Sequence, residues 1–125
     1  MIVGIGTDIF DVSRMRSKLE GDGGRLREVI FTPREVEYCE EKRYPARHYA
    51  ARFAAKEALL KALAYDGRGG LVWRQIEIDR DRSGQPRVLL HGKLRERAES
   101  LFVNRILVSL SHSNTTAVAQ VILES

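Results

Sequence analysis

The chain has 125 residues, 43% hydrophobic and 30% charged, which is typical of one globular domain, expected here over residues 1–125. No apolar run approaches the ~20 residues of a membrane span, and the N-terminus lacks the basic start of a signal peptide. Cys39 is the single cysteine, so no disulfide within the chain is expected. We therefore expect a cytoplasmic protein without a membrane partner. The net charge of +4 favours an acidic partner, which could be nucleic acid, a phosphorylated ligand or an acidic protein.

Residues 1–9 alternate along the chain in the manner of a strand. One face is mostly apolar, whereas the other presents Gly4, Gly6 and Asp8. Glycine in a strand often marks the close approach of a ligand or of another backbone, and two glycines leave open space beside the carboxylate. Asp8 is therefore a candidate site residue, with a cap or turn role as the alternative.

Basic residues gather in the next segment. Residues 11–20 have helical spacing with Val12, Met15 and Leu19 inward, a glycine-rich break follows at 21–24, and residues 25–30 continue the chain. The basic side chains are Arg14, Arg16, Lys18, Arg25 and Arg27. Such a charge run is usually a solvated face, and a docking surface for an acidic partner is the alternative.

Two helices are expected next. Thr32 as N-cap, Pro33 at the first helical position and Glu35 as the capping-box partner predict a helix to about residue 42. A second helix is expected over about 47–65, because residues 50–62 contain strong helix formers and neither glycine nor proline. Ala55, Leu59, Ala62 and Leu63 form its expected buried stripe.

Charged side chains on this second helix form two pairs with i,i+4 spacing. Glu57 and Lys61 share one face and can touch, which by itself is the pattern of an ordinary surface pair. Arg52 and Lys56 form a pair of like charges that repel mildly unless an anion lies between them.

The second half of the chain reads as strands with one helix. Residues 66–70 form a glycine-rich helix stop, whose match to a phosphate-binding loop is weak. Strands are expected at 72–79, 86–91, 106–111 and 115–123, with a hairpin turn at 81–84. A helix is expected at 92–104, with Leu94, Ala98, Leu101 and Phe102 inward. Because β and α elements do not alternate regularly, the predicted class is α+β, with a small antiparallel sheet packed with helices.

Asp8 and Glu57 are the carboxylates to which the chemistry points. No zinc-ligand spacing and no serine-nucleophile motif is present in the sequence. Proteins usually hold Mg²⁺ with one or two carboxylates, water and substrate phosphates. Lys61, one turn beyond Glu57, could bind or protonate a departing phosphate oxygen. The residues alone therefore indicate Mg²⁺-dependent phosphoryl chemistry.

Several sequence motifs, which follow one another in a fixed order, resemble those of a known family. They are Gly4-Ile5-Gly6-Thr7-Asp8-Ile9, Phe31-Thr32-Pro33-x-Glu35, Arg52-Phe53-Ala54-Ala55-Lys56-Glu57-Ala58-x-x-Lys61-Ala62, Ile76-Glu77-Ile78 with Gly84-x-Pro86, and Ser109-Leu110-Ser111-His112 followed by Ala117-x-Ala119. Together they resemble the holo-[acyl-carrier-protein] synthase family, the small type of 4′-phosphopantetheinyl transferase, over nearly the whole chain. The segment around Lys56 and Glu57 is the most specific.

The resemblance implies both a fold and a reaction. The fold would be that of a 4′-phosphopantetheinyl transferase. The reaction would move 4′-phosphopantetheine from coenzyme A to a serine of apo acyl carrier protein and release 3′,5′-ADP, with Mg²⁺, in support of fatty acid biosynthesis. The resemblance further implies a homotrimer with sites at subunit interfaces, so Asp8 and Glu57 are expected to meet across two chains.

Residue roles follow from the same resemblance. Asp8 and Glu57 would be the metal ligands, Lys61 would contact the reacting phosphate, and Arg52 and His112 would hold the nucleotide end of coenzyme A. The base for the serine would be Glu57 or a metal-bound water. The family's docking surface for the acidic carrier protein would correspond to Arg14, Arg16, Arg25 and Arg27, although the glycines at 21–24 interrupt a stretch that the family commonly keeps helical.

Two other classes of protein remain as alternatives. A small basic nucleic-acid-binding module would fit the charge, but the stacking aromatics, the helix-turn-helix pattern and the zinc knuckle that usually accompany it are missing from the sequence, so no nucleic-acid partner is expected. A trimeric protein that has kept the fold and lost the activity is the second, and the retained Asp8, Glu57 and Lys61 argue against it.

Overall fold

The structure, a computed structural model, describes residues 1–66 and 72–125. Its elements in chain order are β1 (Ile2–Asp11), α1 (Val12–Gly21), α2 (Arg25–Ile30), α3 (Pro33–Glu40), α4 (Pro45–Ala62), the 3₁₀ helix η1 (Val72–Gln75), β2 (Ile76–Arg80), β3 (Pro86–Leu90), α5 (Gly92–Ser100), β4 (Arg105–His112) and β5 (Thr116–Glu124). The predicted α+β class is confirmed. Within the described ranges, no helix is long and apolar enough to cross a membrane.

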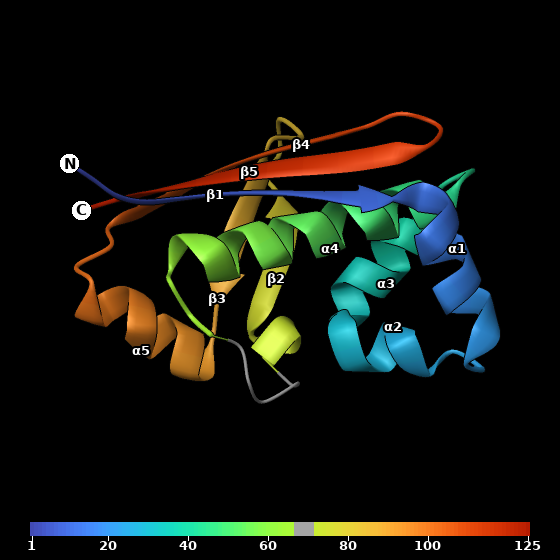
Figure 1. Cartoon of the computed structure of the whole chain (residues 1–125), viewed down its shortest axis with the longest axis horizontal. Coiled ribbons are helices and arrows are strands. Elements are labelled where there is room, and N and C mark those ends of the chain that lie inside the picture. Colours follow the sequence, from blue (N-terminus) through green and yellow to red (C-terminus); the bar gives the residue numbers. More distant parts are fainter. Residues whose placement is uncertain (67–71) are drawn as a thin grey trace.

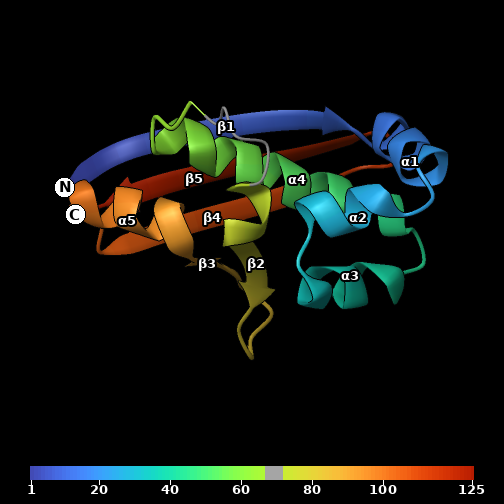
Figure 2. The same cartoon turned by 90° about the horizontal axis from the view of Figure 1, so that it is seen from below.

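Two antiparallel sheets form the β part of the fold. The larger one has the strand order β1-β5-β4, and the smaller is the β2-β3 hairpin. Figures 1 and 2 show α4 lying along one face of the larger sheet, with α1, α2 and α3 gathered at one end of it and α5 at the other. The chain termini lie side by side at the α5 end, where the Ser125 N–H donates to the Met1 carbonyl at 2.9 Å.

The glycine face of β1 packs directly against α4. A Cβ atom on Gly6 would overlap the carbonyl oxygen of Ala58, and one on Gly4 would overlap that of Ala62. The expectation of open space beside Asp8 is therefore wrong at the glycines, because the approaching backbone fills it. The apolar face of β1 is the exposed one, with Ile5 60% and Ile9 65% accessible.

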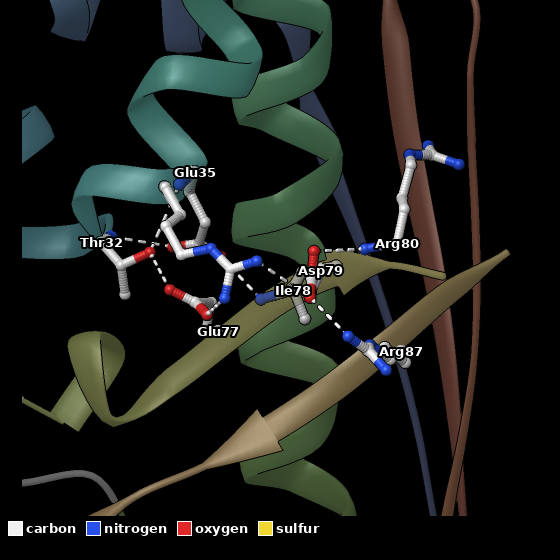
Figure 3. A network of polar contacts seen from close by, with 8 residues as sticks. Thr32, Glu35, Glu77, Ile78, Asp79, Arg80 and Arg87 are labelled. Atoms are coloured by element: carbon white, nitrogen blue, oxygen red, sulfur yellow. Dashed lines mark hydrogen bonds and ion pairs between the residues drawn. The ribbon is translucent and has the colours of Figure 1, made fainter. Parts of the chain in front are cut away.

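The predicted capping box at the start of α3 is confirmed and belongs to a larger buried network. The Thr32 side chain accepts from the Glu35 N–H, and the Glu35 carboxylate accepts from the Thr32 N–H at 2.9 Å. The other Glu35 oxygen accepts from the Ile78 N–H at 2.8 Å, while the Thr32 hydroxyl donates to Glu77 at 2.7 Å. Figure 3 shows these groups meeting between α3 and β2, so the network fixes the hairpin against the helices.

Central α4 is buried around most of its circumference, not along one stripe. Ala55, Leu59 and Leu63 are buried as predicted, and so are Arg52 and Lys56 on another side of the helix. The reason is its position between the large sheet on one side and α1, α3 and β2 on others. Small alanine side chains allow these elements to approach it closely.

Two expectations for the second half are corrected. Residues 72–75 form η1 instead of the first half of a strand, which begins at Ile76. Phe102 is 79% exposed instead of inward, because α5 ends at Ser100 and Phe102 has a positive φ of 59° that turns it away from the helix line. Of the glycine-rich loop expected at 66–70, residues 67–70 lie outside the described residues.

Candidate active site

Asp8, Glu57 and Lys61 come together where β1 crosses α4. Asp8 follows the two glycines on the face of β1 that contacts α4, and it shares a cavity of about 470 Å³ with Glu57. The Lys61 ammonium donates to Asp8 Oδ1 at 3.0 Å and to the Thr7 carbonyl at 3.0 Å. Lys61 thus pairs with Asp8, and the predicted contact between Lys61 and Glu57 is not among the ion pairs of the described residues.

The two carboxylates lie close together within one chain. Burial raises the pKa of Glu57, the negative charge of Asp8 raises it further, and Lys61 and Trp73 act in the opposite direction. The expectation that these carboxylates meet across two chains is therefore wrong. The geometry brings them together through the close packing of β1 on α4, which needs no second subunit.

The donor set suits Mg²⁺. The two carboxylates provide hard oxygen ligands, and the charge of Asp8 raises the pKa of Glu57, so a cation between them would relieve the repulsion. Mg²⁺ typically takes one or two carboxylates and fills its other positions with water and substrate phosphates. The described residues contain no group of three or more histidine, cysteine or acidic side chains that could form a complete protein cage. The site is thus of the kind that completes its coordination with a phosphorylated substrate.

Aromatic side chains form one wall of the cavity. Phe10 and Phe53 meet edge to face with ring centroids 5.0 Å apart, and Phe53 and Trp73 lie 6.0 Å apart. Arg14 from α1 lies over the Phe10 ring, 5.1 Å from its centroid, and Lys18 lines the same cavity. An anion entering the cavity would therefore meet two cations and an apolar wall beside the acid pair.

Arg52 belongs to a second site. Its guanidinium lies 3.9 Å above the Tyr38 ring, and its Nε is buried without a hydrogen-bond acceptor among the described residues. It lines a cavity of about 270 Å³ together with Arg34 and Arg80. Although burial alone would raise it, the charges of Arg52, Arg80 and Lys42 lower the pKa of Tyr38. Glu37, Glu41, Glu77 and Asp79 line the same cavity, and Arg34 pairs with Glu77 and Asp79, so the second cavity is of mixed charge and Arg52 is its buried cation.

His112 lies beside the second site. Its ring is 4.9 Å from that of His48, which in turn contacts Tyr38 with centroids 5.9 Å apart. Burial, followed by the charges of Arg47, Arg52 and Arg80, lowers the pKa of His112. Burial and then the charge of His112 lower the pKa of His48 to about 4. Both imidazoles are therefore neutral near pH 7.

One chain does not join the two groups of candidate residues. Arg52 and Glu57 are five positions apart in α4, which places them about 140° apart around the helix. Asp8 and Glu57 line one cavity, with Lys61 bonded to Asp8, and Arg52 lines another that shares no residue with it.

The four arginines expected to dock a partner are also divided. Arg14 faces the acid-pair cavity, whereas Arg16 and Arg27 line a different cavity beside α1. Arg27 is committed inside the chain, because it pairs with Glu40 at 3.0 Å and donates to the Leu19 carbonyl at 3.2 Å. Arg25 is exposed.

Several residues of these sites were not identified from the sequence. Lys56 was seen as a repelling neighbour of Arg52, yet its ammonium pairs with the buried Glu35 at 2.6 Å. Trp73 and His48 were assigned no role. The signal for Lys56 was the capping-box glutamate, since Glu35 needs a cation once it is buried. No local pattern pointed to Trp73.

Comparison with known proteins agrees with this fold. Residues 4–120 match the 4′-phosphopantetheinyl transferase superfamily. A holo-[acyl-carrier-protein] synthase from Geotalea daltonii is 47% identical over 124 residues, covering 99% of each chain. The crystal structure of holo-[acyl-carrier-protein] synthase from Neisseria meningitidis superposes with a TM-score of 0.90 at 34% identity, covering 100% of both chains.

A Bacillus anthracis holo-(acyl-carrier-protein) synthase in complex with CoA (3′,5′-ADP) superposes with a TM-score of 0.79 at 34% identity, covering 100% of this chain and 98% of that one. The fold and the comparisons together define a phosphopantetheinyl transferase. Within that class, the chain belongs to the holo-[acyl-carrier-protein] synthase family.

Proposed function

We propose that the chain transfers 4′-phosphopantetheine from coenzyme A to a serine of apo acyl carrier protein and releases 3′,5′-ADP. The reaction depends on Mg²⁺ and serves fatty acid biosynthesis in the cytoplasm, with residues 1–125 acting as a single domain. The observation that carries this proposal is that Asp8 and Glu57 share one cavity and Lys61 bonds to Asp8, in a chain of this family. The names of the relatives support the carrier-protein substrate, and the bound ligand of the Bacillus anthracis protein supports coenzyme A.

Asp8 and Glu57 would hold Mg²⁺, which when bound neutralises charge on the diphosphate of coenzyme A. In the transfer, a bond forms between the serine oxygen and the β-phosphorus of coenzyme A, and the bond from that phosphorus to the bridging oxygen breaks. Lys61 contacts the reacting phosphates and protonates the departing oxygen. Glu57 or a neighbouring water accepts the serine proton.

Arg52 and His112 would hold the nucleotide end of coenzyme A. Because they lie across α4 from the acid pair, we propose that the complete site combines Asp8, Glu57 and Lys61 of one subunit with Arg52 and His112 of the next. The uncovered face of the large sheet supports the homotrimer that this requires. That face presents the exposed apolar side chains of Val3, Ile5, Ile9, Leu107 and Val118.

The carrier protein would dock beside the acid-pair cavity. Arg14 and Lys18 stand one helical turn apart on α1 and line this cavity. An acidic carrier protein held there would present its serine to the reacting phosphate. Arg16 and Arg25, which are exposed, would extend the contact, and Arg27 would shape the surface through its bond to Glu40.

The test is the intact mass of apo acyl carrier protein after incubation with this protein, coenzyme A and Mg²⁺. We expect a mass gain of one phosphopantetheine that is lost with EDTA. Glu57→Gln and Asp8→Asn should abolish the gain while leaving the circular dichroism spectrum unchanged. Full activity in both variants would refute the metal assignment. No gain by the folded wild-type protein on several carrier proteins would refute the transferase.

A further inference from the structure

Trp73 is the single tryptophan of the chain, and it lies at the acid pair. Its side chain lines the same cavity as Asp8 and Glu57. Its indole Nε1 is buried and has no hydrogen-bond acceptor in good geometry among the described residues. Folded proteins rarely leave a buried donor unpaired without a functional or structural reason. The unpaired N–H therefore calls for an explanation in terms of the site it faces.

The position of Trp73 is fixed by Lys56, the residue before Glu57 in α4. The Lys56 ammonium donates to the Trp73 carbonyl at 3.0 Å, to the Ile30 carbonyl at 2.7 Å and to Glu35 at 2.6 Å. An ammonium has three protons, so all three are used and Lys56 is a fixed structural group. It ties η1 to the turn of α4 that carries Glu57.

The indole ring is held from a second side. Phe53 lies one helical turn before Glu57 in α4, and its ring contacts that of Trp73 with centroids 6.0 Å apart. The Trp73 side chain also acts against the rise in the pKa of Glu57. Backbone and ring contacts thus hold the indole in the cavity that it shares with Glu57.

We propose that Trp73 is a positioning residue of the transfer site, whose indole N–H fixes the orientation of the Glu57 carboxylate for a divalent cation shared with Asp8. The inference rests on the proposed function. Groups that orient a metal-binding carboxylate act through the ligand, and their removal typically weakens metal affinity or activity by about 10- to 100-fold. The alternative is that the Trp73 ring only packs in the cavity wall and that its N–H has no role.

The variant Trp73→Phe separates these two roles, because it keeps an aromatic ring and removes the N–H. Free Mn²⁺ is measured by electron paramagnetic resonance as the full-length protein is titrated in the presence of coenzyme A. We expect Mn²⁺ binding to weaken by about 10-fold. In transfer assays, the Mg²⁺ concentration for half-maximal rate should rise by a similar factor, with the KM for carrier protein unchanged. A thermal unfolding curve verifies that the variant is folded.

A closer test keeps the shape of the indole. Replacing Trp73 with 3-benzothienylalanine puts sulfur in place of the N–H, so packing is retained and only the donor is lost. The control is Phe102→Leu, which alters an aromatic side chain that is 79% exposed and lies outside the cavity. Glu57→Gln should abolish the Mn²⁺ binding, which shows that the signal reports the acid pair.

The outcomes separate this inference from the proposed function. Weaker Mn²⁺ binding in both Trp73 variants, with Phe102→Leu like wild type, supports the positioning role. Wild-type binding and transfer in Trp73→Phe and in the benzothienyl variant would overturn that role and leave the transferase intact. Loss in Trp73→Phe but not in the benzothienyl variant would assign the effect to packing and overturn the N–H role. Transfer by the wild-type protein without any Mn²⁺ binding would overturn the metal assignment and this inference together.

Discussion

Replacement of Lys56 by methionine tests the buried ion pair that anchors α4. The Lys56 and Glu35 side chains are both 0% exposed and pair at 2.6 Å. Burial lowers the pKa of Lys56, and the charge of Glu35 opposes this shift, so the Glu35 carboxylate stabilises the charged form of the buried ammonium. Methionine matches the length of the lysine stem but leaves Glu35 buried without its cation.

The cost should be large. Breaking a buried pair by removing one partner typically costs about 3–5 kcal/mol, because an uncompensated charge stays in the interior. Small domains are stable by only about 5–15 kcal/mol, so we expect Lys56→Met to remove a substantial part of the free energy of unfolding. The two carbonyls of Ile30 and Trp73 also lose their donor, which adds to the cost.

Urea unfolding followed by circular dichroism measures this effect. Lys93→Met, on the exposed side of α5, is the matched control and should change stability by less than about 0.5 kcal/mol. Adding Glu35→Gln to Lys56→Met removes the stranded charge, so the double variant should be more stable than the sum of the two single effects predicts. A loss below about 1 kcal/mol for Lys56→Met, or strict additivity, would refute the reasoning.

Two further predictions concern packing and titration. A Cβ at Gly6 would overlap the Ala58 carbonyl oxygen and lie 2.8 Å from the carbonyl carbon. Gly6→Ala should therefore lower the free energy of unfolding by about 1–3 kcal/mol and reduce the rate of transfer. Gly21→Ala is the control and should do neither, because a Cβ there would have no atom within 4 Å. His48 has a pKa of about 4 against an ordinary 6.5, so the unfolded chain binds its proton first, and stability falls as the pH drops through this window. His48→Gln should flatten that part of the stability curve.

Each of these has a clear contrary result. Unfolding curves for Gly6→Ala that match wild type would show that α4 can move away from β1 at no cost. A proton NMR titration in which the His48 imidazole changes charge near pH 6.5 would contradict the effect of burial and of the neighbouring cations. Equal pH dependence of stability in wild type and His48→Gln would do the same.

The sequence predicted best where the signals are local. The capping box at Thr32 and Glu35 lies within one helical turn, and it formed as expected. The inward face of α1, with Val12, Met15 and Leu19, followed directly from helical spacing. In such cases a few neighbouring residues determine the backbone by themselves, so no knowledge of the rest of the fold was needed.

Contacts between distant segments were not predictable in the same way. Lys56 and Glu35 are 21 positions apart, and Thr32 and Glu77 are 45 apart, so neither pair leaves a periodic pattern in the chain. Trp73 was expected in a strand because apolar and polar side chains alternate over residues 72–79. In the structure it lies in the 3₁₀ helix η1, and its carbonyl accepts a hydrogen bond from Lys56. In each case a tertiary contact overrode or extended the local preference.

The glycines of β1 connect the fold to the chemistry. Because Gly4 and Gly6 have no side chain, the α4 backbone can lie against this face of β1, and each added Cβ would push the helix away. Asp8 is the next residue on the same face, so the close packing carries it to Lys61 and into the cavity of Glu57. The glycine pattern was interpreted as room for a ligand. Its physical role is to remove that room, and the short distance between strand and helix is what creates the acid pair.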